Sequence, residues 1–299
     1  MASFVIRPLS PHIGAVVDGI NLGDNFSTAD IAALHAGLMA HRIIFFENQT
    51  ITPRQQRDFS ARFGALHSHP VYPPLPDVPE VMVLDNHPGN PTHNDNWHSD
   101  TTFLPEPPMG ALLHAVEIPP SGGDTIWANM VMAAATLSAP LRAFLAGLSA
   151  EHSFMRAFPP DWTVSKNAGR EKYEKAVREN PPEIHPVIRT HPETGEDILN
   201  VNYGFTTKIK GLRGNESRML LQFLHAHVQK PEFQVRWRWK KGDIAFWDNR
   251  STQHYAVNDY LPHRRIMHRT LLKGDRPFYD PARARDAVKI AASPERRHA

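Results

Sequence analysis

The chain has 299 residues, of which 41% are hydrophobic, so it is long and apolar enough to bury a substantial core. Its formal net charge is only +2, from 33 basic and 31 acidic residues, which gives no global electrostatic support for binding nucleic acid. It contains no cysteine, and this excludes disulfides, thiolate metal ligands and cysteine nucleophiles.

Targeting and membrane signals are also missing from the pattern. The N-terminal residues do not show the basic region and apolar run of a signal peptide. No apolar stretch reaches the roughly 18 residues that a membrane-spanning helix needs. We therefore expect a cytoplasmic protein with no membrane partner.

The N-terminal part of the chain alternates between strand and helix patterns. Residues 4–20 are predicted to form short strands. A pattern similar to a capping box, Ser27–Asp30, predicts the start of a helix. Residues 41–46 form a buried strand candidate, and a second helix over 52–63 is expected to end at Gly64.

The middle of the chain is richer in loops. Residues 67–96 contain many Pro, His, Asn and Asp residues, with one strand expected at Val81–Leu84. A third helix is predicted across residues 131–148. Residues 157–185 carry Pro, Lys and Glu, which indicates an exposed insertion that could act as a mobile lid.

The last third begins with a helix and continues as strands. The helix is predicted over Glu216–Gln229, with an apolar face formed by Met219, Leu220, Phe223 and Leu224. From Phe233 onward, period-two alternation and tight turns predict strands. We expect a single domain over residues 1–279, mainly β with flanking α-helices as a sandwich or barrel, followed by a basic tail over 280–299.

One candidate metal site consists of His98-Ser99-Asp100 and the remote His254. On a strand, alternate side chains share a face, so His98 and Asp100 would project together. Two imidazoles and one carboxylate can hold one face of a divalent ion such as Fe(II) and leave the opposite face open for chemistry. The same residues could also be ordinary structural or surface residues, and the spacing alone does not decide between these interpretations.

Two arginines follow the remote histidine. If residues 264–272 form a strand, Arg265 and Arg269 share one face with Met267 and Leu271. Arginines on an inner face are costly unless each meets an anion, and a guanidinium binds a carboxylate or sulfonate through paired hydrogen bonds. The alternative is a basic, exposed edge strand.

Five longer motifs show that the chain resembles the Fe(II)- and 2-oxoglutarate-dependent dioxygenases of the taurine dioxygenase type. They are Phe63–Tyr72, Asn94–Asp100, Gly122–Trp127, Asp248–Ala256 and Arg264–Arg269, within a resemblance that extends from about Ile6 to Tyr279. It implies a double-stranded β-helix, or jelly roll. It also implies Fe(II) as the metal, with 2-oxoglutarate and O2 as cosubstrates.

The resemblance assigns roles to individual residues. His98, Asp100 and His254 would bind the iron and so be catalytic, and Thr125 and Arg265 would hold the distal carboxylate of 2-oxoglutarate. His69 and Arg269 would bind the sulfonate of the substrate, and Tyr72 and Asn94 would lie near its amine end. The apolar walls would be Phe103, Phe158 and Phe205.

The implied reaction is hydroxylation of taurine at the carbon that bears the sulfonate, which releases sulfite and aminoacetaldehyde together with succinate and CO2. His93 stands where an acidic residue is expected in taurine-specific relatives, and Ala157 where a small polar residue is expected, so the preference for an amine is open. A small-molecule sulfonate is the implied partner, and the family commonly forms homodimers or homotetramers.

Two alternatives remain at this point. One is a dioxygenase of the same type that acts on other alkanesulfonates, alkyl sulfates or aryloxyacetates. The other is a binding protein that kept the jelly roll without turnover.

Overall fold

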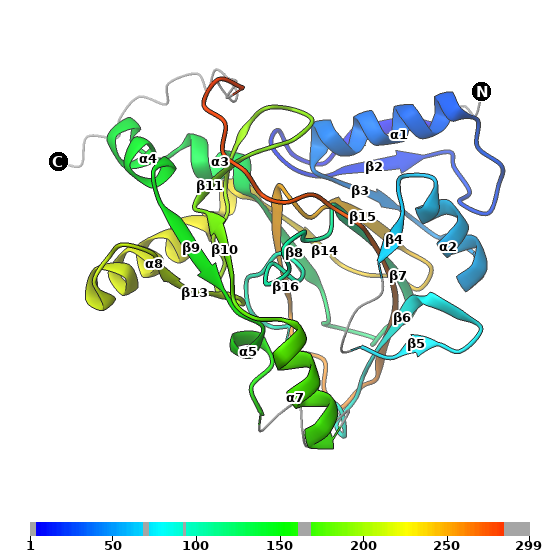
Figure 1. The fold of residues 1–299 in the computed structure, drawn as a ribbon. Helices are drawn as coiled ribbons and strands as arrows, with labels where there is room; N and C mark the ends of the chain where they lie inside the picture. Colours follow the sequence, from blue (N-terminus) through cyan, green and yellow to red (C-terminus); the bar gives the residue numbers. More distant parts are fainter. Residues whose placement is uncertain (1–3, 68–71, 92–93, 161–168, 284–299) are drawn as a thin grey trace.

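The computed structural model describes residues 4–67, 72–91, 94–160 and 169–283. Two β-sheets face each other as a double-stranded β-helix, and helices cover both outer sides (Figure 1). The jelly roll that the resemblance implies is therefore confirmed. In the part of the chain described, no helix is long and apolar enough to cross a membrane.

The larger sheet contains most of the strands, and neighbouring strands pair antiparallel except for β2 and β3. In spatial order they are β1 (Val5–Pro8), β2 (Ala15–Asp18), β3 (Ile43–Phe46), β15 (Ile244–Asp248), β7 (Gly110–Glu117), β17 (Arg265–Leu272), β6 (Val78–Asn86) and β5 (Pro74–Leu75), with β4 (Leu66–His67) paired to β17. The predicted strands at 4–20, 41–46, 81–84 and 264–272 are confirmed.

The smaller sheet consists of β14 (Gln234–Trp237), β8 (Thr125–Asn129) and β16 (Thr252–Ala256) in that order. A core of aliphatic side chains, with Phe45, Trp127, Trp239 and Trp247 among them, fills the space between the two sheets. The Phe45 ring of β3 stacks on Trp237 of β14 at 4.1 Å between centroids, and it meets Trp127 of β8 edge-on at 5.6 Å. Such aromatic packing fixes the separation of the two sheets, so side chains from both can meet in one interior.

Helices α1 (Thr28–His41) and α2 (Pro53–Ala61) pack on the outer face of the larger sheet. Both begin with a capping box, formed by Ser27 with Asp30 and by Thr52 with Gln55. Each box satisfies backbone N–H groups that the first helical turn leaves unpaired. These local signals explain why both helices were predictable from the sequence.

The outer side of the smaller sheet is covered by α3 (Met130–Ala135), α4 (Ala139–Ala146), α8 (Gly214–Val228) and the hairpin of β11 (Ile188–Thr190) and β12 (Asp197–Leu199). The single helix predicted across 131–148 is wrong. The chain leaves the helical path at Thr136, and α4 starts anew with Pro140 in its first turn. Proline lacks the N–H that a continuous helix requires at that position.

Helix α8 exists as predicted, but only half of its predicted apolar face is correct: Leu224 is buried and Leu220 packs against the core, whereas the other two residues face outward. Met219 and Phe223 are 68% and 48% exposed, whereas Leu221 and Leu224 are buried. The helix is anchored by Ser217, whose hydroxyl accepts a 2.8 Å hydrogen bond from the backbone N–H of Ile209. Together with the burial of Leu221, Leu224 and Val228 in the core, this contact accounts for the face that the helix turns inward.

Residues 157–185 are only partly the exposed insertion that we predicted. They include α7 (Gly169–Glu179) and β10 (Glu183–Pro186), and β10 pairs with β9 (Ser149–His152), which also pairs with β13 (Thr206–Ile209). Between β9 and α7 lies the short helix α5 (Phe154–Ala157), and Tyr173 of α7 is buried against it. Residues 161–168 lie outside the described residues, as do residues 284–299 of the predicted tail.

Candidate metal centre

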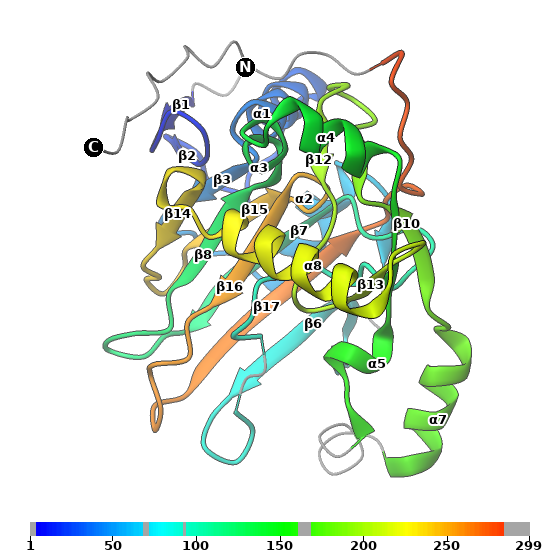
Figure 2. The same cartoon turned by 90° about the vertical axis from the view of Figure 1, so that its left-hand side faces the viewer.

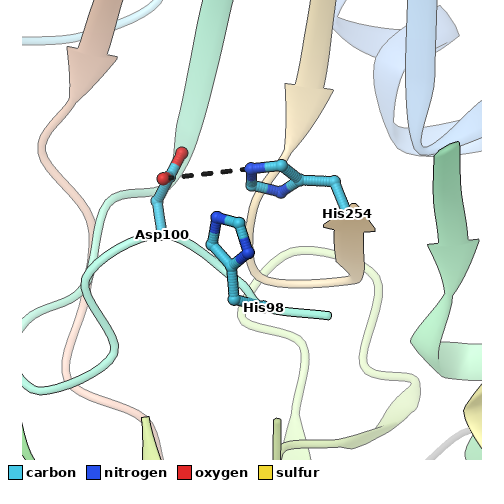
Figure 3. A group of neighbouring side chains, drawn as sticks. All are labelled: His98, Asp100 and His254. Atoms are coloured by element: carbon cyan, nitrogen blue, oxygen red, sulfur yellow. Dashed lines mark ion pairs between the residues drawn. The ribbon is translucent and has the colours of Figure 1, made fainter. Parts of the chain in front are cut away.

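The three predicted metal ligands meet in the interior of the protein. They are His98, Asp100 and His254, which we call the triad. Each offers one ligand atom, and these atoms all lie within 4.8 Å of one another. The Nε2 atom of His254 is 4.0 Å from Oδ1 of Asp100 (Figure 3). Two imidazoles and a carboxylate at this spacing form a donor set that suits a first-row divalent metal.

A turn, rather than the predicted strand, brings His98 and Asp100 together. His98 forms an isolated bridge with His254: each backbone N–H donates to the carbonyl of the other, at 3.0 and 2.7 Å. Asp100 follows in a turn, in which Thr101 has a positive φ of 47°. The expectation that Ser99 points elsewhere is confirmed, since its hydroxyl donates to the carbonyl of Thr252 at 2.7 Å.

Two asparagines orient the candidate ligands. The backbone carbonyl of Asn96 lies 2.8 Å from Nδ1 of His98, which leaves Nε2 of that ring for a metal. The Asn249 side chain accepts from the N–H of Asp100 at 2.7 Å and donates to its carbonyl at 3.1 Å. Sequence reasoning assigned no role to Asn249, although it lies in the Asp248–Ala256 motif.

Burial keeps both imidazoles neutral. It lowers the pKa of His98 and holds the pKa of His254 well below its ordinary value, and the neighbouring His98 adds to the effect on His254. Asp100 opposes both shifts but does not reverse them. A neutral imidazole has the lone pair that a metal ion needs.

Arg269 lies beside the triad, on the inward face of β17 as predicted. Its Nη1 donates to Oδ1 of Asp100 at 2.8 Å, and its guanidinium carbon is 5.4 Å from the centre of the Tyr72 ring. The side chain is almost completely buried. A buried guanidinium of this kind can bind a second anion through its remaining N–H groups.

A cavity opens onto His98 and Asp100 and gathers most of the predicted substrate residues. Its lining is Tyr72, Asn94, Asn96, His98, Asp100, Thr101, Ala157, Phe158, Gly204, Phe205 and Arg269. Asn96, Thr101 and Gly204 were not predicted, because no local pattern shows which loops meet at a cavity. The Tyr72 hydroxyl donates to Oδ1 of Asn94 at 3.1 Å, which fixes both side chains at one wall.

Phe103 does not line this cavity. It is fully buried behind the wall, with its ring centre 5.4 Å from that of Phe205 and 6.3 Å from that of Phe158. It supports the wall rather than facing the cavity. Two further residues of the sequence analysis, His69 and His93, lie outside the described residues.

Arg265 and Thr125 form a second basic position, between the two sheets. Nη2 of Arg265 lies 3.4 Å from the Thr125 hydroxyl, and its Nε donates to the carbonyl of Gly123 at 3.1 Å. Within the described residues, no carboxylate forms an ion pair with this buried guanidinium, and burial lowers its pKa to about 10. Neither residue lines the cavity beside Arg269.

Comparison with known proteins agrees with this geometry. The family model described as "Taurine catabolism dioxygenase TauD, TfdA family" matches residues 6–271. A sulfate ester dioxygenase that depends on alpha-ketoglutarate, from Pseudomonas putida, is 37% identical over 91% of this chain and 90% of its own length. An alkylsulfatase from Acinetobacter baylyi is 34% identical over 90% of this chain and 85% of its own.

Solved structures show the same similarity. A taurine dioxygenase from Burkholderia xenovorans matches with a TM-score of 0.78 at 37% identity, and the match covers 92% of each chain. A protein named AAD-2, in complex with Mn(II) and N-oxalylglycine, matches with a TM-score of 0.76 at 26% identity, over 93% of this chain and 100% of the other.

Proposed function

Because the chain belongs to the TauD/TfdA family of dioxygenases, we propose that His98, Asp100 and His254 hold the Fe(II) ion that the reaction requires. The protein is an oxidoreductase that uses Fe(II), 2-oxoglutarate and O2. The residues present fit the ion, since two neutral imidazoles and a carboxylate converge. Asn96 holds the ring of His98 through its backbone carbonyl, and Asn249 holds the main chain of Asp100. The loaded centre supplies the oxidant that replaces a C–H hydrogen with hydroxyl, while 2-oxoglutarate becomes succinate and CO2.

Arg265 and Thr125 bind the distal carboxylate of 2-oxoglutarate in this proposal. Support comes from the buried guanidinium of Arg265, whose hydrogen-bond partners among the described residues are a hydroxyl and a carbonyl. A carboxylate would supply the counter-charge that such a group lacks, through charge-assisted hydrogen bonds.

The observation that carries the choice of substrate is the position of Arg269, in the cavity wall and 2.8 Å from Asp100. An anionic head group bound there places its neighbouring carbon beside the candidate ligands. We therefore propose hydroxylation of the carbon next to a sulfonate or a sulfate ester. The hydroxylated product breaks down to an aldehyde, with sulfite released from a sulfonate and sulfate from an ester.

The lining residues favour a neutral organic tail over the ammonium of taurine. Apart from Asp100 and Arg269, the described lining residues are neutral, with Phe158, Phe205, Ala157 and Gly204 as an apolar stretch. Among the described lining residues Asp100 is the one carboxylate, and it already pairs with Arg269 and is a proposed metal ligand. An ammonium group buried beside these residues would meet no further carboxylate among them, which costs free energy. Alkyl sulfates and alkanesulfonates are therefore the first candidates, in line with the names of the two curated relatives, and taurine is the second.

The test is a comparison of released sulfur species. The purified protein would be incubated in air with Fe(II), ascorbate and 2-oxoglutarate, and with hexyl sulfate, pentanesulfonate, taurine or phenoxyacetate. Sulfate from hexyl sulfate or sulfite from pentanesulfonate, with matching succinate and a higher kcat/KM than for taurine, is the expected result. A best kcat/KM for taurine would reverse the preference for a neutral tail. Turnover of phenoxyacetate alone would contradict the proposed head group.

A further inference from the structure

A buried cluster of polar side chains lies behind the loop that carries Asp100. We call it the Thr102 cluster, and its members are Thr102, His152, His185, Asn202 and Thr206. Each is 4% exposed or less. None of them lines the cavity, and no role in the proposed reaction has yet been given to any of them.

The hydroxyl of Thr102 is the centre of this cluster. It accepts a hydrogen bond from Nδ2 of Asn202 at 3.0 Å and lies 2.9 Å from Nδ1 of His152. Because the amide nitrogen can only donate, the hydroxyl hydrogen is available for the imidazole, which accepts it in its neutral form. The backbone carbonyl of Thr102 lies 3.0 Å from Nε2 of His185, so both ends of the residue are held.

The three segments that meet at this hydroxyl each continue into the cavity wall. Thr102 follows Asp100 by two positions in the chain. Asn202 accepts a 2.8 Å hydrogen bond from the N–H of Phe205, which lines the cavity. His152 ends β9, and the chain continues into α5 (labelled in Figure 2). Phe158, which directly follows α5, also lines the cavity.

The wall segment also packs directly against a candidate ligand. A Cβ added at Gly204 would lie 2.8 Å from Cβ of His98, closer than real Cβ atoms approach. The N–H of Gly204 donates to the carbonyl of Trp97 at 3.1 Å. A shift of residues 202–205 would therefore be transmitted to His98 by steric contact.

From these contacts we infer that Thr102 is a positioning residue. Its hydrogen bonds with His152 and Asn202 hold the loop that carries Asp100 in place relative to the two chain segments that lead to Phe158 and Phe205 in the cavity wall. The inference rests on the proposed assignment of Asp100 as a metal ligand. It predicts that loss of one buried hydroxyl weakens metal binding even when no substrate is present. It also predicts that residues 96–104 and 202–206 loosen together.

The experiment measures Mn(II) affinity in the presence of 2-oxoglutarate, from the EPR signal of the free ion. Thr102→Val keeps the shape of the side chain, leaves the Nδ2 donor of Asn202 without its Thr102 acceptor, and leaves Nδ1 of His152 with the more distant Thr206 hydroxyl at 3.4 Å. We expect Mn(II) binding about tenfold weaker, the lower end of the range for residues that orient metal ligands. Hydrogen exchange should become faster in both 96–104 and 202–206, and Thr102→Ser should restore both properties.

A matched control is Thr136→Val. The Thr136 hydroxyl also contacts a histidine, Nε2 of His227 at 3.1 Å, but it lies between α3 and α8 and away from the cavity. This variant should bind Mn(II) like the wild type. If Thr102→Val does not fold, His152→Phe removes the imidazole acceptor from the same hydroxyl and should show the same loss.

The inference is overturned if folded Thr102→Val or His152→Phe binds Mn(II) within twofold of the wild type, or if Thr102→Ser fails to restore affinity. Asp100→Asn is measured in the same assay. Retained Mn(II) binding in Asp100→Asn would overturn the metal-site assignment and this inference with it. A wrong assignment of the sulfate or sulfonate substrate would leave these results unchanged, because neither measurement contains a sulfate ester or a sulfonate.

Discussion

At the scale of single residues, Arg269 is proposed to bind two anionic groups, the carboxylate of Asp100 and the head group of the substrate. Its Nη1 is bound to Asp100, and the same guanidinium faces the cavity in which the anionic head group is proposed to bind. Lysine would keep the charge but lose the planar set of donors that can contact two anions at once. Substitution of Arg269 by lysine should therefore weaken substrate binding more than it lowers the free energy of unfolding.

We predict that Arg269→Lys raises the KM for the best sulfate or sulfonate substrate by about 10- to 100-fold, because charge-assisted hydrogen bonds contribute about 1.5–3 kcal/mol. Steady-state kinetics of sulfate or sulfite release would measure it. The control is Arg264→Lys, an exposed arginine of the same segment that pairs with Asp85, and its kinetics should not change. An unchanged KM in Arg269→Lys would remove the anion-binding role.

At the scale of elements, local signals and tertiary contacts differ in what they reveal. The capping residues Ser27 and Thr52 mark their helices in the sequence itself, because the hydrogen bonds are local. The buried face of α8 depends on a contact with β13, and the turn at Asp100 depends on Asn249, far away in the chain. Such contacts leave no local pattern, so these features were predicted wrongly or missed.

Two neighbouring residues of α8 test the corrected orientation of this helix. Leu224 is fully buried and Phe223 is 48% exposed, although both were predicted on one apolar face. Leu224→Ala should lower the free energy of unfolding by about 2–5 kcal/mol. Phe223→Ala should lower it by less than about 1 kcal/mol, as for surface positions. Urea denaturation would compare them, and equal losses would contradict the orientation.

The buried histidine of β10 predicts acid sensitivity. Burial, aided by the cations of Arg189 and Arg276, lowers the pKa of His185 from 6.5 to about 4. The unfolded chain then binds a proton at higher pH than the folded protein, so stability falls as pH drops from 6.5 to 4. This single group contributes a loss of up to about 3 kcal/mol.

Urea denaturation between pH 7 and pH 4 would measure this effect. His185→Gln should show a shallower decrease in the free energy of unfolding over that interval than the wild type. Substitution of His263, which is exposed, should leave the slope unchanged. An unaltered slope in His185→Gln would show that His185 is not responsible.

At the scale of the whole molecule, the proposed iron and 2-oxoglutarate would be bound by residues that come from both sheets. His254 belongs to β16 and Thr125 to β8 of the smaller sheet, and Arg265 belongs to β17 of the larger one. The resemblance identified these residues and the jelly roll from sequence motifs. It could not show the cavity lining at Gly204 or the Thr102 cluster, because these depend on how loops from distant parts of the chain pack.

We predict that Mn(II) with 2-oxoglutarate stabilises the protein against heat. At ligand concentrations about 100 times Kd, binding to the folded state alone adds about 2.7 kcal/mol. At roughly 2–4 °C per kcal/mol for a large domain, Tm should rise by several degrees. Calorimetry should show no shift in Asp100→Asn, and Arg265→Lys should keep the shift caused by Mn(II) while losing the part added by 2-oxoglutarate. A full shift in Asp100→Asn would disprove binding at the triad.

The backbone bridge between His98 and His254 also bears on when the protein can acquire its metal. A ribosome releases His98 and Asp100 long before His254, so an unfinished chain carries two of the three proposed ligands without the strand to which His98 is bridged. Iron held by so few ligands is bound weakly and remains open to uncontrolled reaction with oxygen. The order of synthesis therefore makes iron loading a step that follows completion of the fold, and a nascent chain halted before β16 should emerge free of metal.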